Sequence, residues 1–185
     1  MVRMPGIFVS YRRSDSQADA GRLSDRLIAQ FGKDRIFKDV DSIPIGADFR
    51  TQLNDVLNQC QVALVVVGAR WIDARDEAGA RRLDNPEDFV RIEVEAALAR
   101  GIPVVPVLVG NATMPTEAQL PPSLGPFAYR QATAVRPDPD FHRDTDRLVA
   151  ALHEMFAPPK AADDPLAHRM GQALGAGQAK RSGTA

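Results

Sequence analysis

Arg12 and Arg13 are two adjacent positive charges that directly follow an apolar stretch, IFVSY at 7–11. A guanidinium group binds phosphate through a planar fork of donors, so a pair of arginines at a strand end can hold the phosphates of a nucleotide. Ligands of α/β proteins commonly bind just outside the carboxyl ends of the strands. The alternative interpretation is that both charges are solvated at a strand end and contribute only to solubility.

Glu93 is the second residue that raises a chemical question. In its helical segment Glu87, Arg91 and Glu95 are spaced by four, which predicts an ion-pair ladder on a solvated face. Glu93 falls nearly opposite Arg91, on the side of Phe89 and two alanines, where it has no local partner. A carboxylate in such a place is costly unless a ligand or another element uses it. The alternative is that Glu93 lies at the helix edge and reaches water.

Several catalytic signatures are absent from the sequence. It has no G-x-G-x-x-G after its first strand, no G-x-x-x-x-G-K-[ST] and no G-x-S-x-G, so Ser10 is a poor candidate nucleophile. The three histidines, His142, His153 and His168, lack the spacing of metal ligands. The single cysteine, Cys60, has no disulfide partner and is interpreted as a small core residue. We therefore expect no metal site.

The composition is that of a globular protein without a strong overall charge. Of 185 residues, 44% are apolar and 25% are charged, and the formal net charge is -1. This balance excludes a global electrostatic attraction to nucleic acid or to an anionic membrane. The longest apolar runs, VALVVV and VVPVLV, are too short to span a bilayer, and the chain does not begin with a signal-peptide pattern. We expect a cytoplasmic protein that contacts neither nucleic acid nor membrane directly.

Alternating strands and helices must position these residues. The predicted strands cover 7–11, 35–40, 62–68, 102–109 and 128–135, and the predicted helices cover 16–31, 47–60, 88–101 and 138–156. This alternation predicts a doubly wound α/β domain, in which helices cover both faces of a parallel sheet. Loops are expected at 41–46, which contains both Pro and Gly, and over most of 110–126. Residues 157–185, rich in Ala, Gly and Pro, predict a linker or disordered tail after a domain at 1–156.

The chain resembles a bacterial Toll/interleukin receptor (TIR) domain over residues 6 to about 156. Three segments carry the resemblance: IFVSYRRSD, FKDVDSIPIGADF and DFVRIEVEAALARGIPVVPVLV. They are similar to the first strand and its box, to the second strand with the loop that follows, and to the helix and strand around a functional glutamate. VVVGARWID, at the end of the third strand, also resembles bacterial members.

The resemblance implies a fold, an activity and a catalytic residue. The fold is a flavodoxin-like, doubly wound five-stranded parallel sheet. The activity of many members is cleavage of NAD+ at the nicotinamide glycosidic bond, which releases nicotinamide and ADP-ribose or a cyclic form of it. Glu93 falls on the catalytic glutamate of the family, and Phe89 falls where several active members carry tryptophan. NAD+ would be a substrate, and no prosthetic group is implied.

The resemblance also implies contacts to the nucleotide. Arg12 and Arg13 fall on positions that contact it, Tyr11 precedes them as in the family, and Pro44 lies in the loop that borders the ligand and moves on assembly. Tyr11, Phe89 and Trp71 could offer aromatic surfaces to rings, although for Trp71 packing in the core is the preferred interpretation.

Two further functions compete with NAD+ cleavage. In the first, the domain is a non-enzymatic module that binds other TIR domains, as a scaffold or as a virulence factor that imitates host signalling. In the second, it is a nucleoside-processing hydrolase. The presence of Glu93 favours an NAD+-cleaving enzyme that acts in signalling or anti-phage defence and is activated when it assembles with other TIR domains.

Overall fold

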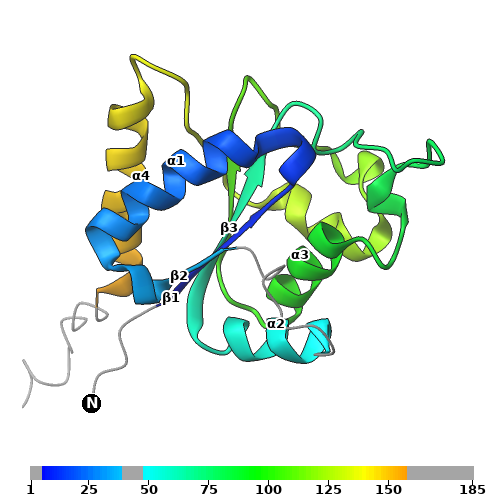
Figure 1. Ribbon diagram of the computed structural model, residues 1–185, viewed down its shortest axis with the longest axis horizontal. Coiled ribbons are helices and arrows are strands. Elements are labelled where there is room, and N and C mark those ends of the chain that lie inside the picture. The colour runs from blue at the N-terminus through cyan, green and yellow to red at the C-terminus, as the bar shows by residue number, and fades with distance from the viewer. Residues whose placement is uncertain (1–5, 39–47, 158–185) are drawn as a thin grey trace, which may run out of the picture.

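A five-stranded parallel sheet forms the centre of the protein in the computed structural model, which describes residues 6–38 and 48–157 (Figure 1). The strands are β1 (Gly6–Tyr11), β2 (Ile36–Lys38), β3 (Cys60–Val67), β4 (Val104–Leu108) and β5 (Thr133–Ala134). Their spatial order is β2-β1-β3-β4-β5, and all neighbours are parallel. The chain turns outward in opposite directions from β1 and from β3, so the switch point of the sheet lies between the carboxyl ends of these two strands. The predicted flavodoxin-like fold is confirmed.

Four helices cover the two faces of the sheet: α1 (Arg13–Phe31), α2 (Phe49–Leu57), α3 (Phe89–Ala99) and α4 (Phe141–Phe156). Helices α1 and α4 lie on one face, and α2 and α3 lie on the other (Figure 1). Each helix has the predicted apolar stripe, and the stripe points at the sheet. None of the described helices is long and apolar enough to cross a membrane.

Side-chain alternation along β1 decides which residues reach which face. Ile7 and Val9 are buried against α1 and α4, whereas Phe8 is buried against α2 and α3. Burying such a side chain completely stabilises the fold by about 1.5–3 kcal/mol. Ser10 and Arg12 follow Phe8 at intervals of two residues along extended backbone, so their side chains point to the same side of the sheet, which α3 covers.

The fifth strand is much shorter than predicted. The sequence predicts a strand at 128–135, but β5 is only two residues long, and the first two residues of the predicted range belong to the 3-10 helix η5 (Pro122–Tyr129). Leu124 and Phe127 of η5 are fully buried in the core on the α3 side. Tertiary packing of this turn outweighs the local β propensity.

The other short elements lie at the ends of the connections. They are η1 (Lys33–Arg35), η3 (Arg82–Asp84) and η4 (Glu117–Gln119). Helix α1 begins three residues earlier than predicted and is irregular at Ser16, whose φ is -135°. The predicted loop at 41–46 and all but the first residue of the predicted tail at 157–185 lie outside the described residues.

Candidate functional site

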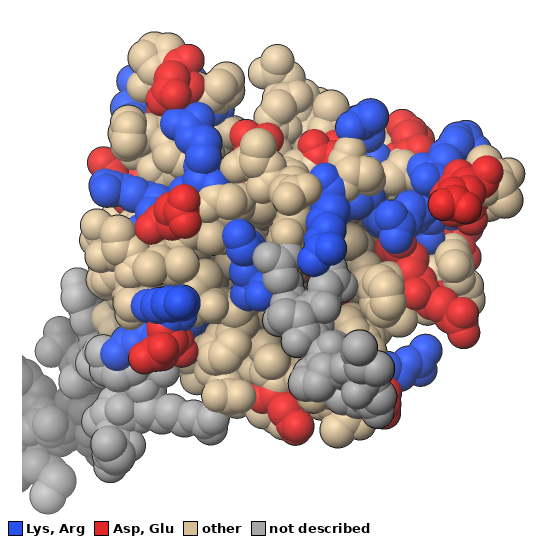
Figure 2. Space-filling model, in the orientation of Figure 1, with Lys and Arg blue, Asp and Glu red and all other residues tan. Residues whose placement is uncertain are grey.

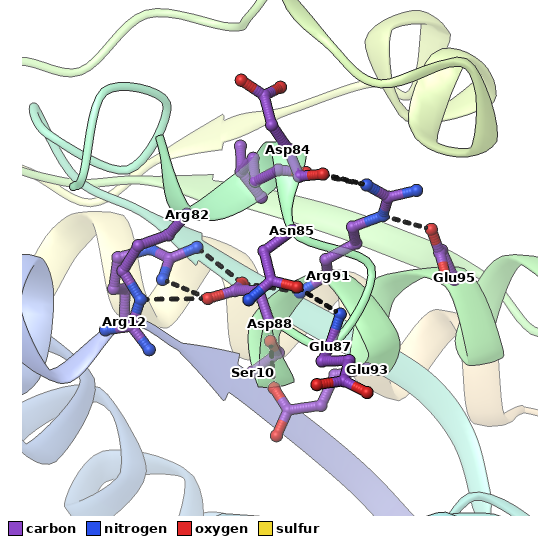
Figure 3. A network of polar contacts seen from close by, with 11 residues as sticks. Ser10, Arg12, Arg82, Asp84, Asn85, Glu87, Asp88, Arg91, Glu93 and Glu95 are labelled. Carbon is purple, nitrogen blue, oxygen red and sulfur yellow. Dashed lines mark hydrogen bonds and ion pairs between the residues drawn. The ribbon is translucent and has the colours of Figure 1, made fainter. Parts of the chain in front are cut away.

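Glu93 accepts a hydrogen bond from a side chain at the carboxyl end of the sheet. Ser10 Oγ, from β1, donates to Glu93 Oε2 at 2.6 Å (Figure 3). Ser10 is 1% exposed, and Glu93 is half-buried. This donor comes from a strand 83 residues earlier, so another element uses the Glu93 carboxylate, as the sequence analysis allows. The site therefore spans β1 and α3.

Arg12, which directly follows β1, makes a second link to the start of α3 through Asp88. The guanidinium donates from Nη1 and Nη2 to the two carboxylate oxygens, both at 2.9 Å, and each side chain is 1% exposed. Asp88 is also the N-cap of α3, because its carboxylate accepts from the backbone N–H of Arg91 at 3.1 Å. Arg82 Nε donates to the same carboxylate at 3.1 Å. Asp88 thus accepts hydrogen bonds from Arg12, Arg82 and Arg91, which lie in three different parts of the chain (Figure 3).

The charge of Asp88 is maintained despite its burial. Burial raises the pKa of this carboxyl, but the hydrogen bonds and positive charge of Arg12, together with the Arg91 N–H and Arg82, outweigh that effect and hold the pKa below its usual value. A bidentate arginine–carboxylate pair is among the stronger interactions of this type. Asp88 is therefore ionised across the physiological pH range.

The two adjacent arginines have different surroundings. Arg12 is buried, its two terminal nitrogens are engaged by Asp88, and its Nε has no hydrogen-bond partner among the described residues. Arg13 is exposed at the first position of α1. A phosphate contact of Arg12 would require its side chain to leave Asp88, with which it is buried, so the predicted contact stays a prediction. The exposure of Arg13 is compatible with ligand contact.

Phe89 lies one helical turn before Glu93 and presents part of its ring to solvent. It is 48% exposed, and its centroid lies 4.7 Å from that of Phe49, at the start of α2. A ring supported on one side by another aromatic ring can offer its remaining surface to a planar ligand. Phe89 and Glu93 are thus brought together as the sequence predicts.

The other predicted aromatic contacts lie elsewhere. Tyr11 is half-buried against the α1 and α4 core, on the opposite side of the sheet from Glu93, with Lys38 Nζ at 6.0 Å from its ring centroid. Trp71 is fully buried and stacks on Phe127 at a centroid distance of 5.5 Å, which matches its preferred interpretation as a core residue. Pro44 lies outside the described residues, and its role stays a prediction.

Arg91 belongs to a packed junction rather than to a solvated ladder. Its Nε donates to Glu95 at 2.7 Å, but its Nη1 donates to the backbone oxygens of Leu83 and Asp84, and its side chain is only 15% exposed. Glu87 precedes the helix, which begins at Phe89. The predicted ladder is therefore correct for the pair of Arg91 and Glu95. It is wrong for Glu87, which lies outside the helix, and for the solvent exposure of Arg91.

A further carboxylate ties α1 to the end of β3 at the switch point. Asp15 accepts from the backbone N–H groups of Gly68 at 3.0 Å and Arg70 at 2.8 Å. Arg70 Nη2 in turn donates to the backbone oxygen of Ser14. These bonds hold the segment that carries Arg13 against the neighbouring strand end.

A polar cavity of about 390 Å³ lies beside the start of α3. Phe89, Asp88 and Arg82 contribute to its lining, together with charged residues of the 75–77 connection. Its volume falls within the range of small-molecule sites. Within 6–38 and 48–157, no three His, Cys, Asp or Glu side chains lie close enough to hold a metal ion.

A family model described as TIR domain matches residues 7–149 of the chain. The chain belongs to the TIR domain family. Among solved structures, this TIR domain is similar to the TIR domains of the activated Roq1 resistosome that directly recognizes the pathogen effector XopQ, with a TM-score of 0.53 and 13% identity. That likeness covers 81% of this chain and 98% of the other, and it concerns the fold. No curated protein matches the chain at a significant level.

The structural roles of three residues near the site were not predicted from the sequence. They are Ser10 as a donor to Glu93, Asp88 as the partner of Arg12, and Asp15. An aspartate immediately before an amphipathic run is a helix-start signal, so the capping role of Asp88 could have been found. Its pairing with Arg12 had no local signal, because the two residues are 76 positions apart.

Proposed function

We propose that this TIR domain cleaves NAD+ at the nicotinamide glycosidic bond, with Glu93 as the catalytic carboxylate. The observation that carries the proposal is the half-buried Glu93, held by Ser10 at 2.6 Å near the carboxyl end of β1 and one turn after the half-exposed Phe89. A carboxylate beside an aromatic surface at the switch point suits a ligand with a planar ring and a ribose.

The reaction needs few catalytic groups. Nicotinamide is a cationic pyridinium in NAD+, so when the bond between its nitrogen and the ribose carbon breaks, the electron pair goes to nitrogen and the ring departs neutral without an acid. Positive charge then develops on the ribose, where the Glu93 carboxylate stabilises it. Water captures the ribose carbon and loses a proton to solvent, which gives ADP-ribose. Capture by an adenine nitrogen instead would give a cyclic product.

The surroundings of Glu93 assign roles to its neighbours. Phe89 offers the exposed part of its ring to the nicotinamide or the adenine. Arg13, exposed at the start of α1, contacts the phosphates, where the helix N-terminus adds a favourable partial charge. Arg12 is too deeply buried to share that role.

Assembly with other TIR domains would activate the enzyme. The solved relative of the same fold is described as part of an activated resistosome, which supports an assembled active state for this chain as well. Clustering at high local concentration is therefore part of the test.

The test is NAD+ consumption and nicotinamide release by the purified chain, first dilute and then tethered into clusters. We expect Glu93→Gln to lower kcat by about 10²–10³-fold, the range for loss of one transition-state charge contact. Glu154→Gln, an exposed position on α4, is the matched control and should keep wild-type activity.

Two results would contradict the proposed NAD+ cleavage. Activity in folded Glu93→Gln equal to that of the wild type would remove Glu93 from the mechanism. A folded wild type that leaves NAD+ intact in every clustered state would favour the non-enzymatic TIR interaction module instead.

A further inference from the structure

Ser10 of β1 and Arg12, the residue directly after β1, contact α3 at two points along its length. Arg12 is the N-cap of α1 but keeps an extended backbone, with φ -99° and ψ 114°, so its side chain projects to the same side as that of Ser10 two residues earlier. Ser10 contacts Glu93, in the second turn of α3, and Arg12 contacts Asp88, its N-cap (Figure 3). The two contact points are separated by about 7.5 Å along the helix axis.

We propose that Arg12 is a positioning residue, which places Glu93 for catalysis by holding Asp88 at the start of α3, rather than a ligand of the phosphates. This inference rests on the proposed function. The apolar side of α3 packs against the sheet, and the contact at Glu93 lies in its second turn, so neither contact fixes the position of its first residue. The bidentate contact at Asp88 holds that position, because two parallel hydrogen bonds fix direction as well as distance.

The burial of the pair opposes a direct role in binding phosphate. Both side chains are 1% exposed. For Arg12 to reach a phosphate, it would have to leave Asp88, and a buried carboxylate without its main partner is strongly unfavourable. Arg82, with 38% of its side chain exposed, donates to Asp88 through one nitrogen only and cannot replace the bidentate contact.

The capping bond gives Arg12 a direct path to the helix. Asp88 Oδ1 accepts both from Arg12 Nη2 and from the backbone N–H of Arg91, which belongs to the first turn of α3. A shift of Asp88 therefore moves the first turn, which carries Phe89 and leads into Glu93. A displacement of about 1 Å at a reacting group can lower the rate of an enzyme by about 100-fold.

The experiment is a kinetic cycle with Arg12→Met, Asp88→Asn and the double variant. Asp88→Asn keeps a side-chain oxygen that can cap α3 and removes the charge. We expect each single variant to lower kcat by about 10- to 100-fold with KM nearly unchanged, and the double variant to be no worse than the more severe single one. Arg13→Met, by contrast, should raise KM.

The opposite pattern would overturn the proposal. If Arg12 bound phosphate, Arg12→Met would raise KM at unchanged kcat, and Asp88→Asn would stay close to the wild type. Asp88→Asn preserves the shape of the side chain, so it carries the kinetic test if Arg12→Met does not fold.

A second readout does not depend on turnover. Amide hydrogen exchange should become faster in the first turn of α3 of Arg12→Met, including the Arg91 amide, and stay unchanged in α4. If the wild type never cleaves NAD+, the proposed function fails, but this comparison still decides whether Arg12 holds α3. Unchanged exchange in α3 would overturn the positioning role.

Discussion

Ser10 of β1 and Glu93 of α3 provide each other with a hydrogen-bond partner. A serine hydroxyl that is 1% exposed needs a hydrogen-bond partner, and the Glu93 carboxylate supplies a charged acceptor at 2.6 Å. The same bond limits the rotamers of a glutamate that would otherwise sample several. One buried hydroxyl thus orients the carboxylate to which the proposed chemistry is assigned.

Gly68 and Asp15 provide a test at the residue scale. An added Cβ at Gly68 would lie 2.3 Å from Asp15 Oδ2, so Gly68→Ala must displace the carboxylate that accepts from Gly68 and Arg70. We expect a loss of about 1–3 kcal/mol in the free energy of unfolding, measured with urea. Gly21→Ala is the control: nothing lies within 4 Å of its added Cβ, and in a helix it should gain about 0.5–1 kcal/mol. Equal effects at the two positions would contradict the predicted contact.

Helices α2 and α3 begin in the same way but differ in the burial of their caps. Asp48 accepts from the backbone N–H of Arg50 at 3.1 Å and is exposed. Asp88 caps α3 and is buried with Arg12. The same residue type therefore performs a local task in one helix and a tertiary task in the other.

Removing each of the two N-cap side chains, Asp48 of α2 and Asp88 of α3, should affect stability to different extents. Asp48→Ala should lower the free energy of unfolding by about 1 kcal/mol, the usual effect of losing an exposed N-cap. Asp88→Ala should lower it by about 3–5 kcal/mol, because it also leaves Arg12 as a buried charge without its partner. Urea unfolding of both variants beside the wild type measures the difference. Similar losses for both would show that the Arg12 contact adds little to stability.

Many charged side chains of the described residues form ion pairs at short range. Positive and negative side chains are interspersed on the face shown in Figure 2, and exposed pairs of this kind contribute little to stability. Asp144 is different, because it is 1% exposed and accepts from Arg136 and Arg147. The Arg136 bonds join α4 to the segment that follows β5, at the end of the sheet far from β2.

Acid unfolding of the whole protein tests the lowered pKa values of Asp144 and Asp88. Arg136 hydrogen bonds lower the pKa of Asp144 despite the opposing effect of desolvation, and the pKa of Asp88 is also lowered. A carboxyl whose folded pKa lies below its unfolded value, about 3.9, adds stability above that pH and loses it as the pH falls through the folded pKa. The free energy of unfolding should therefore decline below about pH 4.

Asp144→Asn isolates one of these contributions. The variant should be less stable than the wild type at pH 7, and the difference in the free energy of unfolding should begin to narrow as the pH falls below about 4, because the unfolded wild-type carboxyl then takes up a proton that the folded one still excludes. A difference that stays constant between pH 7 and pH 3 would contradict the pKa assigned to Asp144.

Most of the secondary structure could be read from the spacing of apolar residues. The runs around β1, β3 and β4 and the stripes of the four helices were predicted within a few residues, and Cys60 was correctly interpreted as a core residue, being 4% exposed. These properties are local, because a strand or helix that must bury one face repeats its apolar residues with the period of its own backbone. The family resemblance and the position of Glu93 on a helix came from the same contiguous segments.

Contacts between distant segments could not be read in this way. The sequence presents Arg12 and Arg13 as equivalent neighbours, but strand alternation and the approach of α3 bury the first against Asp88 and leave the second exposed. Likewise, Ser10 becomes a donor to Glu93, and the fifth strand shrinks to Thr133–Ala134. Each of these outcomes depends on which elements pack together in space, since the free energy of burying a polar or apolar side chain is set by its neighbours in the folded chain.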